Sequence, residues 1–275
     1  MGVLLAGNAA LGLTDGSQVR RDLTASLSQT EVTGLTTTSG GLSGGETVGI
    51  LGIGLGAVTA VSFGGQPADL LAVTNTEVTV VVPHTIGYEP GEVAISLETS
   101  EGPVAGDLTW QYVVASAVDR QLEYAFRHWN DYNLTYFGDF NAWGGDCMNF
   151  VSQTLLARGW RVTEEWFNNA QEEWGDAFVH VPSFDAWLSQ HPEYGAVRLG
   201  LNDRDQAKIG DVVVFDWDGD GSLDHAQVIS QVTTVGDETR IAMVGHNMDT
   251  MYRDLDGALE LQGGPHAQAW IWSIP

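Results

Sequence analysis

The chain has 275 residues, of which 43% are hydrophobic, so it is long enough for one large domain or two ordinary ones with packed cores. Its 36 acidic and 11 basic residues give a formal net charge of -25, which disfavours binding to nucleic acid or to anionic lipid. Such a surface suits a salty medium, a cation-rich cell envelope or cationic substrates, and simple solubility explains most of the acidity. No apolar run approaches the ~20 residues that a membrane-spanning helix needs.

Residues 1–30 are small and polar and show no sustained period, so we interpret them as a leader or linker. The first residues lack the basic flank and the long apolar stretch of a secretory signal. We expect a secreted or cell-surface protein, whose signal has been removed or whose export uses another route.

Residues 31–114 alternate short β-rich runs with glycine and proline turns, a pattern typical of a small β-sandwich. The predicted strands cover residues 46–51, 60–63, 77–82, 92–97 and 108–113. The segments 44–48 (GGETV), 52–55 (GIGL), 61–65 (VSFGG) and 80–83 (VVVP) resemble an IPT/TIG immunoglobulin-like domain. The resemblance implies a spacer or binding module without catalytic activity.

Residues 115–275 carry a mixed α and β signal. Apolar spacing predicts helices over residues 119–131, with Asp119 as the cap, and over 147–158 and 183–190. Strands are predicted over residues 211–215, 225–231, 240–245 and 269–274. A helix followed by an antiparallel sheet is the order that papain-like folds use.

Cys147 is the only cysteine of the chain, so it cannot form an internal disulfide. Gly144 and Gly145 lead into it, and the helical run predicted after it places the thiol at a helix N-terminus. The aligned backbone dipoles there favour thiolate over thiol. We therefore predict that Cys147 is a catalytic nucleophile rather than a small buried hydrophobic residue.

A nucleophilic cysteine needs a base, and His225 is the best placed of the seven histidines because it opens a predicted strand after a buried one. A third polar group usually orients the base. His246 or Asn247, at the end of the next strand, could accept a hydrogen bond from the His225 ring. Strand alternation lets only one of them serve, and we favour His246 over Asn247.

Acyl transfer also needs donors for the oxyanion. The backbone N–H of Cys147 is the natural first donor, and the side-chain amide of Asn141 is a second candidate. An asparagine in a turn is the more ordinary interpretation of Asn141. No cofactor is required for this chemistry.

The segment 144–153 (GGDCMNFVSQ), with Trp129, Asn130, Asn133 and Tyr136 before it, resembles a family of bacterial amidases. That family is similar to the CHAP and NlpC-type cysteine hydrolases of the papain-like group. The resemblance implies that Cys147 attacks an amide carbonyl and that His225 takes the proton. Met148 stands where a threonine is common, which is a mild departure close to the site.

The sequence thus predicts a multi-domain fold. An immunoglobulin-like β-sandwich (31–114) precedes an α+β papain-like domain (115–275), whose nucleophile helix packs on an antiparallel sheet. Cysteine-dependent amide hydrolysis through a thioester is the expected activity, with a peptide or peptidoglycan-like substrate. An inactive adhesion or binding protein on the same fold, or a transamidase, is the alternative. The oligomeric state stays open.

Residues 216–224 (DWDGDGSLD) place carboxylates at alternate positions with a glycine among them, as in the first half of an EF-hand loop. The twelfth position would be Gln227 rather than the usual glutamate. An acidic hairpin turn explains the pattern equally well. The candidate ligands of a structural Ca²⁺ ion are Asp216, Asp218, Asp220, Ser222 and Asp224.

Overall fold

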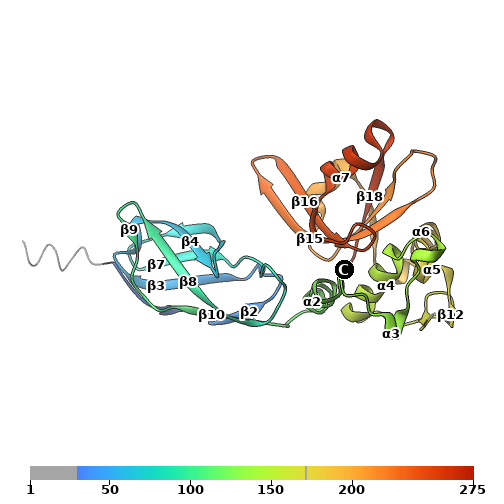
Figure 1. The fold of residues 1–275 in the computed structure, drawn as a ribbon. Helices are drawn as coiled ribbons and strands as arrows, with labels where there is room; N and C mark the ends of the chain where they lie inside the picture. Colours follow the sequence, from blue (N-terminus) through green and yellow to red (C-terminus); the bar gives the residue numbers. More distant parts are fainter. Residues whose placement is uncertain (1–29, 171) are drawn as a thin grey trace, which may run out of the picture. The chain divides into compact units, whose positions relative to one another are not determined.

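The computed structural model describes residues 30–170 and 172–275, so the predicted leader lies outside the described residues except for Thr30. The chain forms two compact units, which are described separately below (Figure 1). Of the described residues, the first unit comprises 30–38, Glu46–Pro83 and Val93–Trp110, and the second comprises Ser39–Gly45, His84–Glu92 and the described part of Gln111–Pro275.

The N-terminal strands form two sheets, as expected for a β-sandwich. Alternating burial along β7 and β10 shows that each has one face in the core and one face in solvent. The sheet orders are β1-β3-β7-β6 and β2-β10-β8-β4-β5, with β9 paired to β8. The bounds are β1 Glu31–Leu35, β2 Ser39–Gly41, β3 Thr47–Ile53, β4 Val58–Phe63, β5 Gln66–Pro67, β6 Asp69–Val73, β7 Glu77–Val81, β8 Gly91–Thr99, β9 Gly102–Pro103 and β10 Thr109–Val113.

The second unit is built on an antiparallel sheet in the order β13-β18-β14-β15-β16-β17. Its strands are β13 Val197–Gly200, β14 Val212–Asp216, β15 His225–Val235, β16 Glu238–Gly245, β17 Thr250–Asp254 and β18 Gln268–Ser273. A small separate ribbon pairs β11 Asn168–Asn169 with β12 Glu173–Trp174. The region after the β-sandwich is therefore α+β, as predicted.

The α-helices of this unit are α2 Ala117–His128, α3 Leu134–Phe137, α4 Cys147–Arg158, α5 Asp176–Val179, α6 Val181–Gln190 and α7 Leu255–Gln262. Short 3-10 turns occur at η1 Leu55–Ala57 in the first unit and at η2 Asn141–Trp143, η3 Pro192–Tyr194, η4 Leu201–Gln206 and η5 Gly264–His266 in the second. Helix α4 packs on α2 and β15, whereas α7 packs on β16 and β17. The sequence prediction did not include α7.

Two helix ends show how local residues set these elements. Helix α4 begins at Cys147 and ends at Arg158, as the apolar spacing predicts. It ends there because Gly159, the next residue, adopts a left-handed φ of 119°. The predicted cap of α2 is wrong. Ser116 is the N-cap and accepts from the backbone N–H of Asp119, while the Asp119 carboxylate accepts from that of Ser116 in a capping box.

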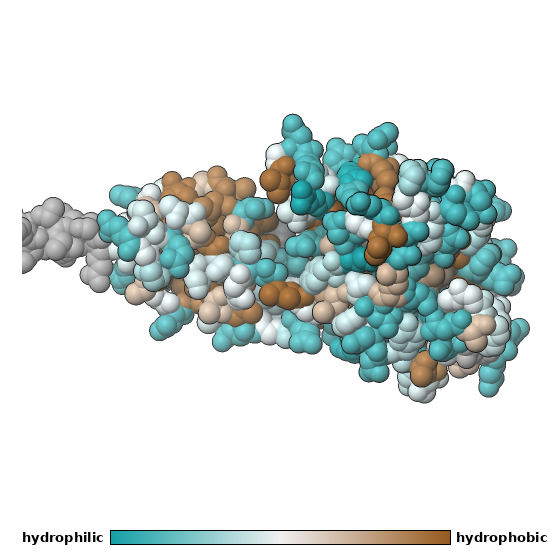
Figure 2. All heavy atoms as spheres, turned by 45° about the horizontal axis from the view of Figure 1, so that its top comes forward, coloured by the Kyte–Doolittle hydropathy of each residue, from teal (hydrophilic) through white to brown (hydrophobic). Residues whose placement is uncertain are grey.

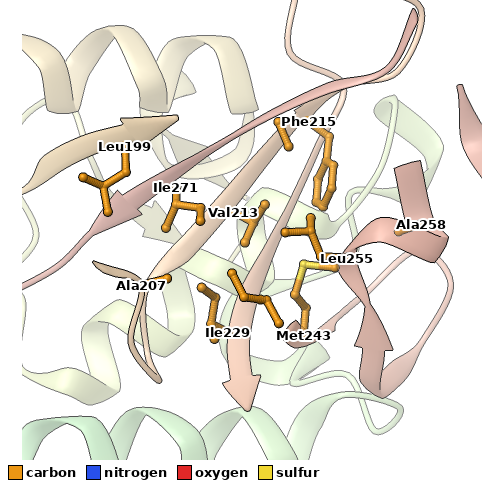
Figure 3. Close-up of a cluster of buried hydrophobic side chains, with 11 residues drawn as sticks. Leu199, Ala207, Val213, Phe215, Ile229, Met243, Leu255, Ala258 and Ile271 are labelled. Atoms are coloured by element: carbon orange, nitrogen blue, oxygen red, sulfur yellow. The ribbon is translucent and has the colours of Figure 1, made fainter. Parts of the chain in front are cut away.

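One face of the sheet forms a hydrophobic core with α7 (Figure 3). Strands β14, β15 and β16 contribute Val213, Ile229 and Met243, and Leu255 comes from α7. Phe215 belongs to the same cluster and lies directly opposite His225 in the register of β14 and β15. Because directly paired residues project to the same face of a sheet, His225 shares the face of Phe215.

Most of the face visible in Figure 2 is hydrophilic, and the hydrophobic residues form separate patches on it. This distribution agrees with the acidic composition. Among the helices of the described residues, none has the length and apolar character needed to span a bilayer.

Replacement of Ile229 by alanine should destabilise the second unit, because a fully buried side chain would leave a cavity in this core. We expect a loss of about 2–5 kcal/mol in the free energy of unfolding. Val235 lies on the same strand and is 67% exposed, so Val235→Ala is the matched control and should have a small effect. Denaturant titration followed by tryptophan fluorescence measures both. Equal losses in the two variants would contradict this description of the core.

Candidate active site

Cys147 is the first residue of α4 and its side chain is only 6% exposed. The loop before it turns through Gly144 and Gly145, which have φ values of 118° and 135°. A Cβ atom at Gly145 would lie 3.1 Å from Oδ1 of Asn247, so a larger residue would be strained and crowded there. These glycines allow the loop to deliver Cys147 to the start of the helix.

Asp146 anchors this loop from inside the protein. Its Oδ1 accepts hydrogen bonds from the backbone N–H of Phe140 and from Nδ2 of Asn149, both at 2.9 Å. Its Oδ2 lies 2.6 Å from Nδ1 of His246. A carboxylate with three partners is well satisfied despite its burial, so the residue before Cys147 has a fixed position.

His246 does not orient His225, which corrects the sequence prediction. Nδ1 of His246 bonds to Asp146, and Nε2 lies 2.8 Å from the carbonyl oxygen of His128. Both ring nitrogens therefore face hydrogen-bond acceptors of other residues. The ring also stacks on Tyr132 with centroids 3.5 Å apart. The contacts of His246 therefore hold the loop of Asp146 and leave no ring nitrogen for His225.

Asn247, the alternative orienting residue, is also bonded elsewhere. Its Oδ1 accepts from the backbone N–H of Asp146 at 2.6 Å, and its Nδ2 donates to Oδ1 of Asn141. Asn141 itself is exposed in the turn η2. The structure thus brings Asn141, Asn247 and His246 together around the loop before Cys147. The role of Asn141 as an oxyanion donor stays a prediction.

His225 opens β15 and is 5% exposed. Its ring lies 5.9 Å from the rings of Phe215 and Trp217, measured between centroids. Nε2 of His225 is buried and has no hydrogen-bond partner among the described residues. The backbone N–H of the next residue, Ala226, faces the sulfur of Cys147. The thiol therefore lies beside the start of the strand that His225 opens.

Burial controls the protonation of both side chains. It raises the pKa of Cys147 to about 11, and the nearby charge of Asp146 adds to the rise, against partial compensation by the N–H groups of Ala226 and Met148. Burial, followed by the positive charge of Arg253, lowers the pKa of His225 to about 3. Burial therefore opposes the thiolate that the helix N-terminus is expected to favour, and it favours the neutral form of both side chains.

Two further polar residues share the surroundings of His225. Both polar atoms of the Gln227 side chain, and both terminal nitrogens of Arg253, are buried without a hydrogen-bond partner among the described residues. The Arg253 guanidinium lies over the ring of Trp217, 5.7 Å from its centroid. In the sequence, only the position of Gln227 indicates that it lies near His225, because it follows two residues later and so projects to the same face of β15.

Cys147 lines a cavity of about 500 Å³. Phe140, Trp143 and Trp174 supply aromatic rings to its wall, and Leu223 and Asp224 reach it from the turn before His225. Asp176, His180 and neighbours from α5 and α6 complete the lining. A substrate bound here would lie next to the sulfur, so the cavity is a candidate substrate site. Sequence reasoning did not identify these residues.

The acidic loop is only partly assembled as a cation site. Asp216, Asp218 and Asp224 each offer a carboxylate oxygen within 4.8 Å of the others. Asp220 and Ser222 are not in this group, and the Asp220 carboxylate accepts from the backbone N–H of Ser222 instead. Asp216 also accepts from the N–H groups of two glycines in the turn. Three of the five predicted ligands are therefore close together.

Comparisons with known proteins assign families to both parts of the chain. Residues 115–272 match the family described as "Putative amidase domain", and residues 31–112 match the IPT/TIG domain. The protein YhbB of Bacillus subtilis (strain 168) is 28% identical over 153 residues, which cover 52% of this chain and 45% of YhbB. The chain thus spans less than half the length of this curated relative.

Two solved structures match about a third of the chain. The plexin A4 extracellular region has a TM-score of 0.29 at 25% identity and covers 31% of this chain and 8% of its own. The gamma-CGTase of an alkalophilic Bacillus clarkii has a TM-score of 0.28 at 22% identity and covers 32% of this chain and 13% of its own.

The raised pKa of Cys147 predicts slow alkylation at neutral pH. The rate with iodoacetamide should rise about tenfold per pH unit above pH 7, because only the thiolate reacts. The rise should level off only near pH 11. The unfolded protein is the control, since an exposed thiol there should titrate near pH ~8.5. A plateau below pH 8 in the folded protein would instead indicate a resting thiolate.

Proposed function

The chain belongs to the amidase family that matches its residues 115–272, and we propose that it hydrolyses amide bonds with Cys147 as nucleophile and His225 as base. The observation that carries this proposal is the position of Cys147. Its sulfur borders a cavity and lies beside the backbone of Ala226, the residue after His225. A nucleophile that borders a substrate-sized space and lies beside the strand opened by a histidine supports acyl transfer as the proposed chemistry.

The proposed reaction starts from the neutral pair. The thiol attacks the amide carbonyl carbon while Nε2 of His225, which has no hydrogen-bond partner among the described residues, accepts the proton. Collapse of the tetrahedral intermediate breaks the C–N bond, and the imidazolium gives its proton to the leaving amine. A water molecule then hydrolyses the thioester, which releases a carboxylic acid and restores the thiol.

Backbone N–H groups support this sequence of steps. Those of Ala226 and Met148 face the sulfur and lower the cost of its developing negative charge. The N–H of Cys147 and the side chain of Asn141 are the proposed oxyanion donors. The pKa difference between the resting thiol and imidazole means that binding of substrate has to promote the proton transfer. Alignment of the two groups with the carbonyl in the cavity would supply this effect.

The architecture that we propose is papain-like, with α4 as the nucleophile helix on an antiparallel sheet. Contacts of α4 with β15 support it. The proposed substrate is a peptide, including cell-wall peptides, and the proposed location is outside the cell or at its surface. The acidic surface and the IPT/TIG domain fit that setting.

Replacement of either proposed catalytic residue should remove amide hydrolysis. We expect Cys147→Ser to abolish turnover and His225→Gln to lower kcat by about 10²–10⁴-fold, since His225 acts in the proton transfer. His180 also lines the cavity but lies between α5 and α6 rather than on the sheet, so His180→Gln is the matched control. Mass spectrometry of products from peptide amides and cell-wall fragments measures the rates.

Two outcomes of this experiment would reject the assignment. Equal hydrolysis by wild type and Cys147→Ser would rule out a cysteine mechanism. A large loss in His180→Gln with little change in His225→Gln would move the base to His180. A product joined to an added amine, rather than to water, would indicate a transamidase.

We also propose a structural Ca²⁺ ion held by Asp216, Asp218 and Asp224, with no catalytic part. Carboxylate oxygens are the ligands that Ca²⁺ prefers, and the three side chains are close enough to share one ion. Asp224 directly precedes His225, so an ion here would stiffen the start of β15.

Ca²⁺ in excess should raise the melting temperature of the protein, and a chelator should reverse the rise. At a hundredfold excess over Kd the stabilisation would be about 2.7 kcal/mol. Asp216→Asn should remove the response, whereas Asp237→Asn, in another acidic turn, should keep it. An unchanged melting temperature in wild type would identify the loop as an acidic turn only.

A further inference from the structure

The cavity beside Cys147 has an aromatic wall that the proposed chemistry does not use. Trp143 is 62% exposed and stacks on Trp174, with ring centroids 5.4 Å apart and planes inclined by 27°. Phe140 forms T-shaped pairs with both indoles, at centroid distances of 5.4 and 5.1 Å. A large indole left in solvent next to a nucleophile is a surface suited to a ligand.

This aromatic wall is tied to the nucleophile. The backbone N–H of Phe140 donates to the carboxylate of Asp146, the residue before Cys147. Trp174 belongs to the ribbon of β11 and β12, whose Asn168 donates to Oδ1 of Asn149 in α4. The wall and the thiol therefore keep a fixed relation, which a substrate-binding surface requires.

The same cavity is acidic. Asp176 and Asp224 line it, and neither takes part in an ion pair within the described part of the chain. The described lining residues include no lysine or arginine, and His180 is the basic residue among them. Asp224 also belongs to the acidic loop, so Asp176 is the lining carboxylate that lies outside the proposed Ca²⁺ site. A carboxylate without an ion pair, in a cavity that indole rings line, favours a positively charged ligand.

We propose that this cavity binds a cationic residue of the substrate, namely a peptide residue that bears a free ammonium group, as lysine does. The ammonium would lie against the indole face of Trp143 or Trp174, and the Asp176 carboxylate would attract its charge. The methylene groups of such a side chain would cover the exposed indole. The net charge of -25 would draw cationic peptides toward the surface in general. This inference deepens the proposed function, because it assigns the substrate class of the same site.

Binding can be measured without turnover in the full chain carrying Cys147→Ser. The probes are three N-acetylated dipeptide amides that differ at one residue, which is lysine, norleucine or glutamate. Norleucine keeps the length of the lysine side chain without its charge. We expect the lysine probe to bind at least about tenfold more tightly than norleucine, and the glutamate probe to bind most weakly. Calorimetry and the quenching of tryptophan fluorescence give the affinities.

Variants then separate the charge from the aromatic surface. Asp176→Asn should weaken the lysine probe about fivefold or more and leave norleucine unchanged. Trp143→Ala should weaken both probes, and Trp143→Phe should restore part of the loss. Glu260→Gln makes the same charge change on the exposed face of α7. It should change the affinity for the lysine probe only by the small amount that the altered net charge causes. Asp176 and Trp143 are both exposed, so these variants should fold normally.

Three results would overturn the proposal. These are no binding of any probe, equal binding of lysine and norleucine, and an equal effect of Asp176→Asn and Glu260→Gln. The proposed function has a separate readout, namely hydrolysis of the same probes by wild type. A lysine preference in binding without hydrolysis would uphold the cavity and reject the enzyme, whereas hydrolysis without a lysine preference would do the reverse.

Discussion

The contact between Asp146 and His246 is the constraint on which the candidate site depends. It joins two residues that are 100 positions apart in the sequence, and both side chains are almost fully buried. Asp146 also holds the backbone of Phe140, and its own N–H donates to Asn247. Through these bonds the end of β16 fixes the turn that delivers Cys147 to the start of α4. Loss of either partner would leave a buried polar group unsatisfied and release the loop.

The same enclosure explains the electrostatics of the site. Burial disfavours charge on both Cys147 and His225, and for the thiol it opposes the effect of the helix N-terminus. The helix dipole is a weaker effect than the desolvation of a side chain that is 6% exposed. A neutral thiol is protected from adventitious oxidation, because thiolate character controls that reaction. In our account the ion pair forms only as bond formation to the substrate begins.

The sequence predicted those parts of the site that local patterns determine. Helix α4 follows from apolar spacing and Gly159, and the place of His225 follows from a turn before a β-rich run. The partner of His246 could not be predicted, because alternation along β16 indicates a face but not which side chain of another element meets it. Trp143 and Trp174 come together through a short ribbon that has no periodic signal. Pairing across long loops, rather than local propensity, decided these contacts.

The central claim is that Cys147 carries an acyl group during turnover. Mass spectrometry tests it most directly, on protein that is quenched in acid while it turns over an ester or amide of a cationic peptide. The account predicts a mass increase equal to the acyl group on the proteolytic fragment that contains Cys147, and its loss on treatment with hydroxylamine. Turnover with no such adduct under rapid quenching, or an adduct on another residue, would contradict the account.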